Sequence, residues 1–266
     1  MTNLLAEILH AKRSRVETAK RELPEAVVCE QAAAHRRAAT PHALLIALGD
    51  TSQVNIIAEF KRRSPSKGDI RGDVDPAAMA RSYQAGGARA VSVLTEQDYF
   101  SGSLDDLIKV RQAVSLPILR KDFIFDAYQI YESAAVGADA VLLIVSALQD
   151  DDLRRLREIA ENELQMDALV EVHNKAEMTR AVTAGAKLIG VNNRNLQTFE
   201  VSLETSVELA TVAPNDVTLV SESGLNSSLD LKRLRALGYK GFLIGESLMR
   251  SEMPETSLQL FIESNN

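Results

Sequence analysis

The sequence predicts an α/β fold, specifically a single (β/α)8 TIM barrel with extra N-terminal helices. Eight short β-branched or aliphatic runs alternate with amphipathic stretches of helical period, as a closed barrel of parallel strands requires. No Gly-x-Gly-x-x-Gly turn follows any of these runs, which argues against a doubly wound open sheet. We predict one domain over residues 1–266, in which residues 1–50 form a helical extension packed on the barrel.

The expected strands are mostly apolar throughout, which suits parallel strands that are covered on both faces. Successive runs begin roughly 20 to 36 residues apart, enough for one crossover helix between each pair. Segments of small residues that contain glycine, at residues 85–88, 136–139, 184–186 and 237–239, indicate helices that end just before a strand. The expected strands are residues 54–58, 90–94, 118–120, 140–144, 168–171, 188–191, 218–221 and 241–244.

Two helices are expected before the first strand. An apolar stripe of helical period covers residues 4–16 and includes Lys12, and an alanine-rich stretch follows at residues 24–37. Both segments are too short and too amphipathic to form a second domain. They are therefore expected to pack on the barrel.

Composition narrows the functional classes. The net charge is −7 with no long basic run, so no nucleic-acid partner is expected. Cys29 is the one cysteine, which excludes an internal disulfide and a thiolate metal site and fits a reducing compartment. Residues 1–5 lack the pattern of an export signal, and the apolar runs are shorter than the ~20 residues a bilayer crossing needs. We expect a cytoplasmic monomer without a membrane partner.

Charged residues stand at the carboxyl ends of several expected strands. The first strand ends in Glu59 and Lys61, the third in Lys121 and the fifth in Glu171. Such ends meet at one mouth of a barrel, where mutual charge and burial shift pKa values toward useful acids and bases. Any one of these charges could simply hydrate an exposed rim, but four together favour a catalytic site.

The loops after the last two expected strands predict a phosphate site. Ser223 and Gly224 follow one strand, and Gly245, Glu246 and Ser247 follow the other. Glycine lets backbone N–H groups approach an oxyanion, and residues 247–250 could form the short helix whose positive end faces it. A phosphorylated small molecule is therefore the expected partner.

Taken in order, the motifs closely resemble the indole-3-glycerol-phosphate synthase family of tryptophan biosynthesis. The resemblance covers residues 4–249, and its blocks are residues 57–68, 93–96, 100–103, 119–124, 169–173, 189–196 and 221–224. It implies a barrel enzyme without metal or organic cofactor. The implied reaction converts 1-(2-carboxyphenylamino)-1-deoxyribulose 5-phosphate into indole-3-glycerol phosphate, carbon dioxide and water, so the enzyme is a carboxy-lyase.

The resemblance also implies roles for the charged residues. Lys121 matches the general acid of ring closure, and Glu171 matches the general base. Glu59 and Lys61 match a second charged pair, in which Lys61 binds phosphate or the substrate carboxylate or donates a proton during dehydration. The resemblance leaves the division of acid roles between the two lysines open.

Further residues are expected to bind or orient the substrate. Asn192 and Ser223 match residues that orient its hydroxyls and the acid-base groups. Ser64 belongs to a segment, residues 62–70, that would close over the substrate. Phe123 and Leu142 would line the slot for the aryl ring. The remaining expected substrate or phosphate contacts are Arg194, Gly224, Gly245 and Glu246.

Two details concern individual side chains. Glu246 is expected to contact phosphate through its backbone N–H alone, with its carboxylate turned away. We expect strand alternation to turn His173 to the face opposite Glu171, and we assign it no catalytic role.

Three alternatives are weighed against this prediction. One is phosphoribosylanthranilate isomerase, another phosphate-handling barrel. A second is a Schiff-base aldolase using Lys121, which would need a depressed lysine pKa where a general acid must stay protonated. The third is a non-catalytic phosphate-binding barrel, which would have no need for Glu59 and Glu171 beside an anionic ligand.

Overall fold

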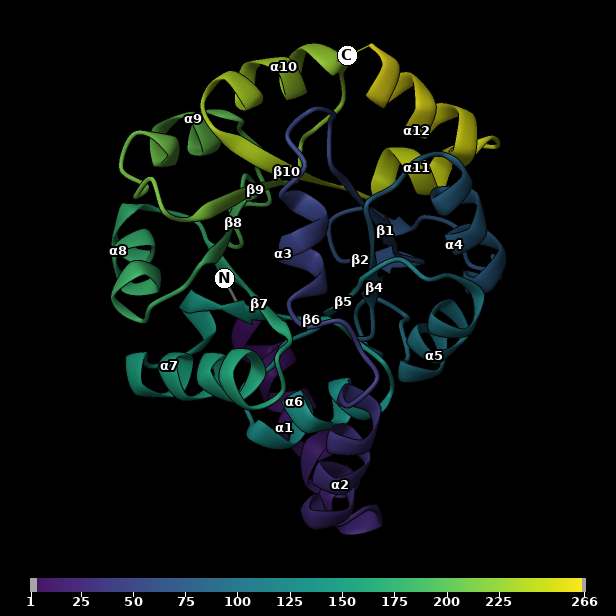
Figure 1. The fold of residues 1–266 in the computed structure, drawn as a ribbon, viewed down its shortest axis with the longest axis vertical. Helices are drawn as coiled ribbons and strands as arrows, with labels where there is room; N and C mark the ends of the chain where they lie inside the picture. Colours follow the sequence, from purple (N-terminus) through teal and green to yellow (C-terminus); the bar gives the residue numbers. More distant parts are fainter. Residues whose placement is uncertain (1–3, 265–266) are drawn as a thin grey trace.

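Eight parallel strands close into a barrel in the computed structural model, which describes residues 4–264 (Figure 1). Neighbouring strands follow chain order around the barrel, and the first strand pairs with the last to close it. The predicted fold class is confirmed. The strands are β1 (Ile56–Phe60), β4 (Ala90–Leu94), β5 (Ile118–Lys121), β6 (Ala140–Ile144), β7 (Asp167–Val172), β8 (Leu188–Asn192), β9 (Thr218–Glu222) and β10 (Tyr239–Ile244).

One strand is displaced from its expected position. β1 runs from Ile56 to Phe60, whereas the expected run ended at Ala58, before the charged Glu59. Glu59 is nevertheless 4% exposed, and it belongs to the strand because its backbone pairs in register with Ser92 of β4; its side chain lines the cavity at the mouth of the barrel. β4 and β6 have the bounds expected from the sequence.

Helices cover the outside of the barrel and follow each strand. A hairpin of β2 (Arg63–Ser64) and β3 (Gly68–Asp69) precedes the first of them. The chain turns left-handed with positive φ at Gly87, Gly137, Gly185 and Gly238, the helix ends expected from the small-residue segments. The helices are α4 (Pro76–Ala85), α5 (Leu104–Ala113), α6 (Ala127–Ala135), α7 (Asp150–Glu158), α8 (Lys175–Thr183), α9 (Glu204–Ala210), α10 (Ser228–Ala236), α11 (Glu246–Arg250) and α12 (Pro254–Glu263).

The apolar core has two layers. The larger layer lies between the strands and the outer helices, and the smaller fills the inside of the barrel. Leu44 and Leu48 of the short helix α3 (Ala43–Leu48) belong to the inner layer. The backbone N–H groups of Leu44 and Leu45 donate to Asp167 at the start of β7, at 2.9 and 3.0 Å. α3 therefore closes the amino end of the barrel and leaves the opposite end for a site.

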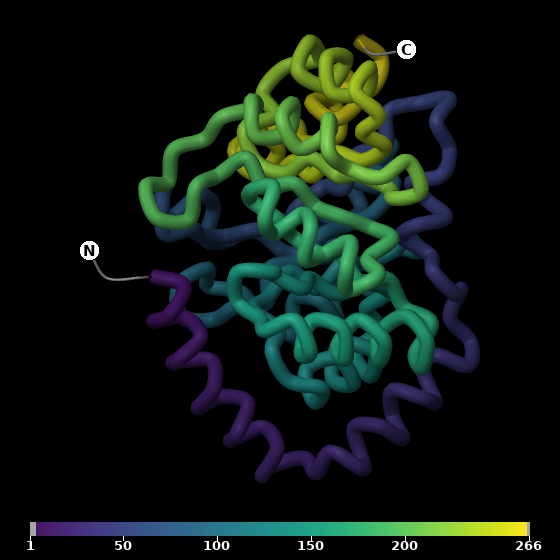
Figure 2. The backbone as a smooth tube through the Cα atoms, turned by 90° about the vertical axis from the view of Figure 1, so that its left-hand side faces the viewer, coloured from purple at the N-terminus to yellow at the C-terminus, as the bar shows by residue number. Residues whose placement is uncertain are grey.

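The first two helices, α1 (Leu4–Glu22) and α2 (Glu25–Arg36), form a V beside the barrel (Figure 2). Both were expected from the sequence. α2 packs against α6, and Tyr128 of α6 donates a hydrogen bond to the carbonyl of Ala19 in α1 at 3.2 Å. α1 thereby runs toward one end of the barrel and α2 toward the other.

Two expectations fall partly outside the described residues. These are the absence of an export signal, which concerns residues 1–5, and the outer bounds of the domain, since the structure describes neither residues 1–3 nor residues 265–266. Within residues 4–264, none of the helices has both the length and the apolar character that a bilayer crossing demands.

Candidate active site

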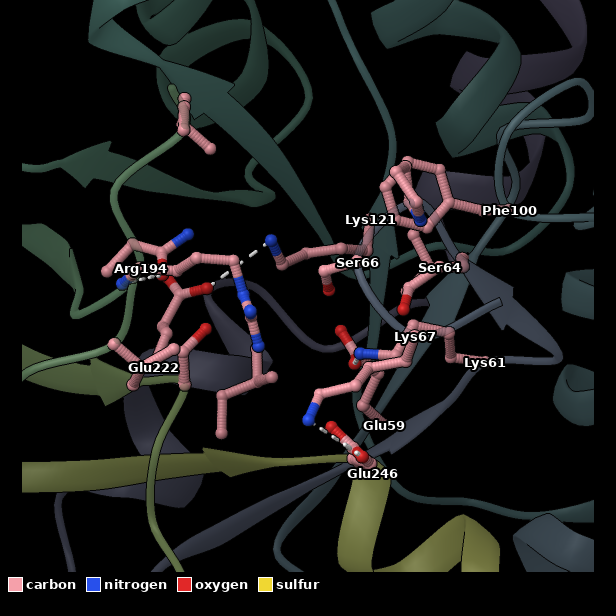
Figure 3. Close-up of a pocket in the computed structure, with 18 of the residues that line it drawn as sticks. Glu59, Lys61, Ser64, Ser66, Lys67, Phe100, Lys121, Arg194, Glu222 and Glu246 are labelled. Carbon is pink, nitrogen blue, oxygen red and sulfur yellow. Dashed lines mark hydrogen bonds and ion pairs between the residues drawn. The ribbon is translucent and has the colours of Figure 1, made fainter. Parts of the chain in front are cut away.

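A cavity of about 620 Å³ lies at the carboxyl ends of the barrel strands. It has polar walls from the strand ends and apolar walls from neighbouring side chains (Figure 3). The structure brings every site residue expected from the sequence to this cavity. These residues are Glu59, Lys61, Ser64, Lys121, Phe123, Leu142, Glu171, Asn192, Arg194, Ser223, Gly224, Gly245 and Glu246.

Lys121 lies between two buried carboxylates. Its Nζ donates to Glu171 Oε2 at 3.0 Å and is 3.3 Å from Glu222 Oε2. Both glutamate side chains are 2% exposed, and Lys121 is 14% exposed. β5, β7 and β9 contribute one residue each, so the contact depends on three strand ends that only barrel closure brings together.

The three groups perturb one another. Burial alone would lower the pKa of Lys121, but the carboxylates around it, above all Glu171, raise it. Burial alone would raise the pKa of Glu171, but the charge of Lys121 helps to lower it well below its usual range. Burial raises the pKa of Glu222 to about 7; the charge of Lys121 opposes burial, and repulsion from the other carboxylates reinforces it. Lys121 is therefore a stable ammonium beside one ionised carboxylate and one that titrates near neutrality.

Glu59 and Lys61 form a second ion pair at the end of β1. Their side chains are 5% and 18% exposed. The spacing of two residues projects both side chains to the same face of the chain. Gly245 leaves the room that this pair needs, because a Cβ at Gly245 would lie 2.4 Å from Glu59 Oε2.

The β2–β3 hairpin covers one side of the cavity. Ser64 is buried, and the hairpin is anchored because Ile70 N–H donates to the carbonyl of Arg62 at 2.8 Å. Lys67, at its turn, is 3.7 Å from the carboxylate of Glu246, across the cavity rim (Figure 3). The Glu246 carboxylate also accepts from Arg250 Nε at 3.3 Å. The carboxylate is thus held by cations, while the backbone N–H of Glu246 starts helix α11.

The chain after β8 and β9 supplies polar groups. Asn192 Oδ1 accepts from the backbone N–H of Arg194 at 3.0 Å. Ser223 and Gly224 both have positive φ, at 66° and 79°. Asn193 connects these two loops, because its Nδ2 donates to the carbonyl of Ser223 at 3.1 Å. The left-handed turn after β9 therefore rests on a buried amide.

An apolar wall faces the charged groups. The rings of Phe123 and Phe100 have centroids 6.1 Å apart and planes inclined by 41°. Leu142 also lines the cavity, as do Leu4, Leu5 and Ile8 of α1. Such a wall suits a flat aromatic group placed beside polar groups that fix its orientation.

A buried ion pair fastens α1 beside this wall. Lys12 Nζ is 2.7 Å from Asp122 Oδ2, and their side chains are 4% and 0% exposed. Asp122 directly follows Lys121 and also accepts from Thr95 Oγ1 at 2.6 Å and Arg120 Nη2 at 3.1 Å. The helix is thereby tied to the strand that carries Lys121.

The expected direction of His173 was wrong. His173 Nε2 lies 3.3 Å from Glu171 Oε1, on the side of Glu171 rather than opposite to it. Residues two positions apart on an extended chain project to the same face, and those residues are two positions apart. Sequence reasoning also left Glu222 out of the expected site, although it recognised that a strand ends there. A carboxylate at that strand end was the available signal.

None of the described residues forms a cluster of histidine, cysteine and carboxylate side chains suited to a metal ion. The polar groups that can hold a ligand are the lysines, carboxylates, amides and backbone N–H groups described above. Together they can bind anions and transfer protons.

Solved structures similar to this chain share its fold at low sequence identity. The thiamine phosphate pyrophosphorylase of Pyrococcus furiosus matches 78% of this chain and 93% of its own, with a TM-score of 0.57 and 16% identity. KGPDC from Streptococcus mutans matches 79% of this chain and 96% of its own, with a TM-score of 0.57 and 14% identity. At this identity the likeness concerns the fold alone.

Sequence comparison is more specific. The "Indole-3-glycerol phosphate synthase" family model matches residues 5–261. The protein of that name from Carboxydothermus hydrogenoformans is 45% identical over 97% of this chain and 99% of its own. The one from Nocardioides sp. is 54% identical over 77% of this chain and 78% of its own. The chain therefore belongs to the indole-3-glycerol phosphate synthase family, whose members are decarboxylating lyases.

Proposed function

We propose that this chain converts 1-(2-carboxyphenylamino)-1-deoxyribulose 5-phosphate into indole-3-glycerol phosphate by general acid-base catalysis at the barrel mouth. The observation that carries the proposal is the contact of Lys121 with two buried carboxylates beside an apolar wall. Family membership supports the same reaction. The chain acts as one barrel domain, with residues 1–50 as a helical extension.

Ring closure needs an acid. The aryl carbon that bears the carboxylate attacks the keto carbon of the sugar, and the keto oxygen gains an electron pair. Lys121 donates a proton to that oxygen. Its raised pKa keeps the ammonium charged before reaction, and the developing alkoxide is more basic still, so transfer becomes favourable as the bond forms. The apolar wall of Phe123 and Leu142 holds the aryl ring against the carbonyl.

Decarboxylation and dehydration follow. Loss of carbon dioxide restores the aromatic ring, and loss of the hydroxyl with a neighbouring proton gives the indole. Glu171 removes that proton, for which its low pKa keeps it ionised. Lys61, paired with Glu59, binds a substrate anion or protonates the departing hydroxyl. Asn192 and Ser223 orient the sugar hydroxyls.

The substrate phosphate binds at the loops that follow β9 and β10. Backbone N–H groups at Gly224, Gly245 and Glu246 face the dianion, and Arg194 and Ser64 close the site. The positive φ at Gly224 supports close approach of the backbone there. The pairing of the Glu246 carboxylate with Arg250 moderates its repulsion of the phosphate.

The same electrostatics disfavours a Schiff-base aldolase. A Schiff base forms from a neutral amine, whereas the carboxylates around Lys121 raise its pKa and hold the charged form. Borohydride trapping with substrate is therefore expected to yield no covalent adduct at Lys121. Detection of such an adduct by mass spectrometry would contradict the role of Lys121 as a general acid.

The proposed activity is tested by adding the substrate to the purified protein and following indole fluorescence. We expect a rise with the wild type and a fall in kcat of about 10²- to 10⁴-fold for Glu171→Gln. Glu252→Gln, at an exposed glutamate, is the matched control and should retain wild-type turnover. No fluorescence rise with the wild type would refute the proposed reaction.

A further inference from the structure

His173 contacts the oxygen of Glu171 that Lys121 leaves free. Lys121 binds Oε2, and His173 Nε2 lies 3.3 Å from Oε1, an ion-pair distance without the alignment of a good hydrogen bond. The His173 side chain is 12% exposed. The carboxylate of Glu171 is thus flanked by a nitrogen on each side.

The imidazole is itself held by Glu177 of α8. His173 Nδ1 is 3.0 Å from Glu177 Oε2, and the same oxygen accepts the backbone N–H of His173 at 2.8 Å. The other oxygen, Oε1, accepts from Asn174 Nδ2 at 2.8 Å. Glu177 is therefore fixed from several directions, and it directs Nε2 toward Glu171. A carboxylate lies beside each ring nitrogen, which favours the charged imidazole with a proton on both nitrogens.

The other carboxylate on Lys121 has no such partner. Glu222 Oε1 is buried and accepts no hydrogen bond from the described part of the chain. It lies over Gly190, where a Cβ would approach it to 2.1 Å. A buried, unpartnered carboxylate oxygen disfavours the charged form. Two glutamates at similar distances from Lys121 thus differ chiefly in the cation behind one of them.

We propose that His173 is a positioning residue that makes Glu171, rather than Glu222, the ionised carboxylate beside Lys121. The inference rests on the proposed role of Glu171 as the base. In this role His173 does not contact the substrate. It acts by placing positive charge behind one carboxylate, so that any proton shared by the pair resides on Glu222.

The charges around the group agree with this assignment. Three charged groups surround Glu171: Lys121 of β5, Glu222 of β9 and His173. Glu59 of β1 acts on Lys121 as a further negative charge. Burial alone would lower the pKa of His173, but its two carboxylate partners raise it to about 10.

On its outer side, His173 faces Glu177 of α8. The exposed pair of Lys175 and Glu208 also lies there, around a shallow depression that His173 lines. The imidazole therefore stays charged through the neutral range.

A purely structural role would not need the ring. The start of α8 is capped by Asn174, whose Oδ1 accepts the Glu177 N–H at 3.0 Å. The hydrogen bond from the backbone of residue 173 to the Glu177 carboxylate needs only an N–H group, which any residue other than proline provides. The imidazole contacts to Glu171 and Glu177 are therefore additional to the cap.

The test compares the pH dependence of kcat in the wild type, the single variants His173→Gln and Glu222→Gln, and the double variant His173→Gln/Glu222→Gln. Glutamine keeps a donor near Glu171 but carries no charge. We expect the ratio of kcat at pH 6 to kcat at pH 8 to fall at least about twofold in His173→Gln, because a proton shared equally occupies Glu171 half of the time. KM should change little. The second substitution removes the competing proton site, so the double variant should regain a ratio close to that of Glu222→Gln alone.

The controls separate this inference from the proposed function. An inactive wild type would refute the proposed reaction, whereas an active wild type with an unchanged ratio in His173→Gln would overturn the inference alone. A loss of kcat that is equal at both pH values would also overturn it, as a structural effect. His10→Gln, at an exposed histidine of α1, should match the wild type.

A second measurement does not depend on catalytic activity. In protein with ¹³C-labelled histidine, the imidazole of His173, assigned by its absence in His173→Gln, should remain protonated through pH 8. Should that variant fail to fold, Glu177→Gln provides the assignment through its altered shift. Titration of the wild-type ring near the ordinary value of about 6.5 would overturn the inference.

Discussion

Glu222→Gln should stabilise the protein, increasingly so as the pH rises. The pKa of Glu222 is raised from 4.5 to about 7 in the folded protein, and each pKa unit corresponds to about 1.4 kcal/mol. Ionising Glu222 therefore costs about 3 kcal/mol more in the folded than in the unfolded chain. Glutamine keeps the size and an acceptor for Lys121 but never ionises.

The sign follows from the raised pKa. The stability that protonated Glu222 contributes is fully present below pH 4.5 and is lost as the pH rises through about 7. The free energy of unfolding of Glu222→Gln, relative to wild type, should thus increase by about 2 to 3 kcal/mol between pH 5 and pH 8. Urea unfolding at several pH values, followed by circular dichroism, measures this difference.

Glu252→Gln is the matched control, since it removes an exposed carboxylate, and its difference from wild type should stay flat with pH. A flat difference for Glu222→Gln, or one that shrinks as the pH rises, would show that Glu222 ionises without penalty in the folded protein. The reasoning about the buried carboxylate would then be wrong.

Three further predictions concern the same end of the barrel. Lys121→Met should lower kcat by at least about 10³-fold while the variant still binds substrate, measured by steady-state kinetics and equilibrium titration; substantial turnover would place the acid elsewhere. Gly190→Ala should displace the Glu222 carboxylate and lower kcat about tenfold or more, whereas Gly72→Ala, with nothing within 4 Å of its added Cβ, should match wild type in the same assay. Lys12→Met should reduce the free energy of unfolding by about 1.5 to 3 kcal/mol in urea titrations, because buried Asp122 loses one charged partner and keeps Arg120 as its cation; a loss below about 1 kcal/mol would contradict this.

The fold was predictable because its evidence is local. Each strand is a short apolar run, and each helix end carries its own turn residues, so alternation can be recognised without knowing any contact. The prediction failed where burial and charge conflict. At Glu59 the apolar run stops but the strand continues, because the backbone of Glu59 pairs with β4 while its charged side chain is buried at the mouth beside Lys61.

The candidate site was predictable to the extent that it lies at strand ends. Lys121 and Glu171 are 50 positions apart, and the barrel rule alone brings them to one mouth. The rule does not say which charges touch. Glu222 was left out because its contact with Lys121 depends on the barrel geometry, and the partnership of His173 with Glu171 was missed through the direction assigned to a single side chain.

The buried pair of Lys12 and Asp122 sets an order of assembly. Its members are separated by 110 positions in the sequence, and the neighbouring contact of Lys12 with Gln97 spans 85. During synthesis α1 emerges before β5, and it cannot complete these contacts until β5 has emerged and formed. Leu4, Leu5 and Ile8 of α1 wall the cavity, so a chain halted before β5 has helix and strands but an open mouth. The wall that α1 contributes to the cavity is thus completed only after β5 has formed.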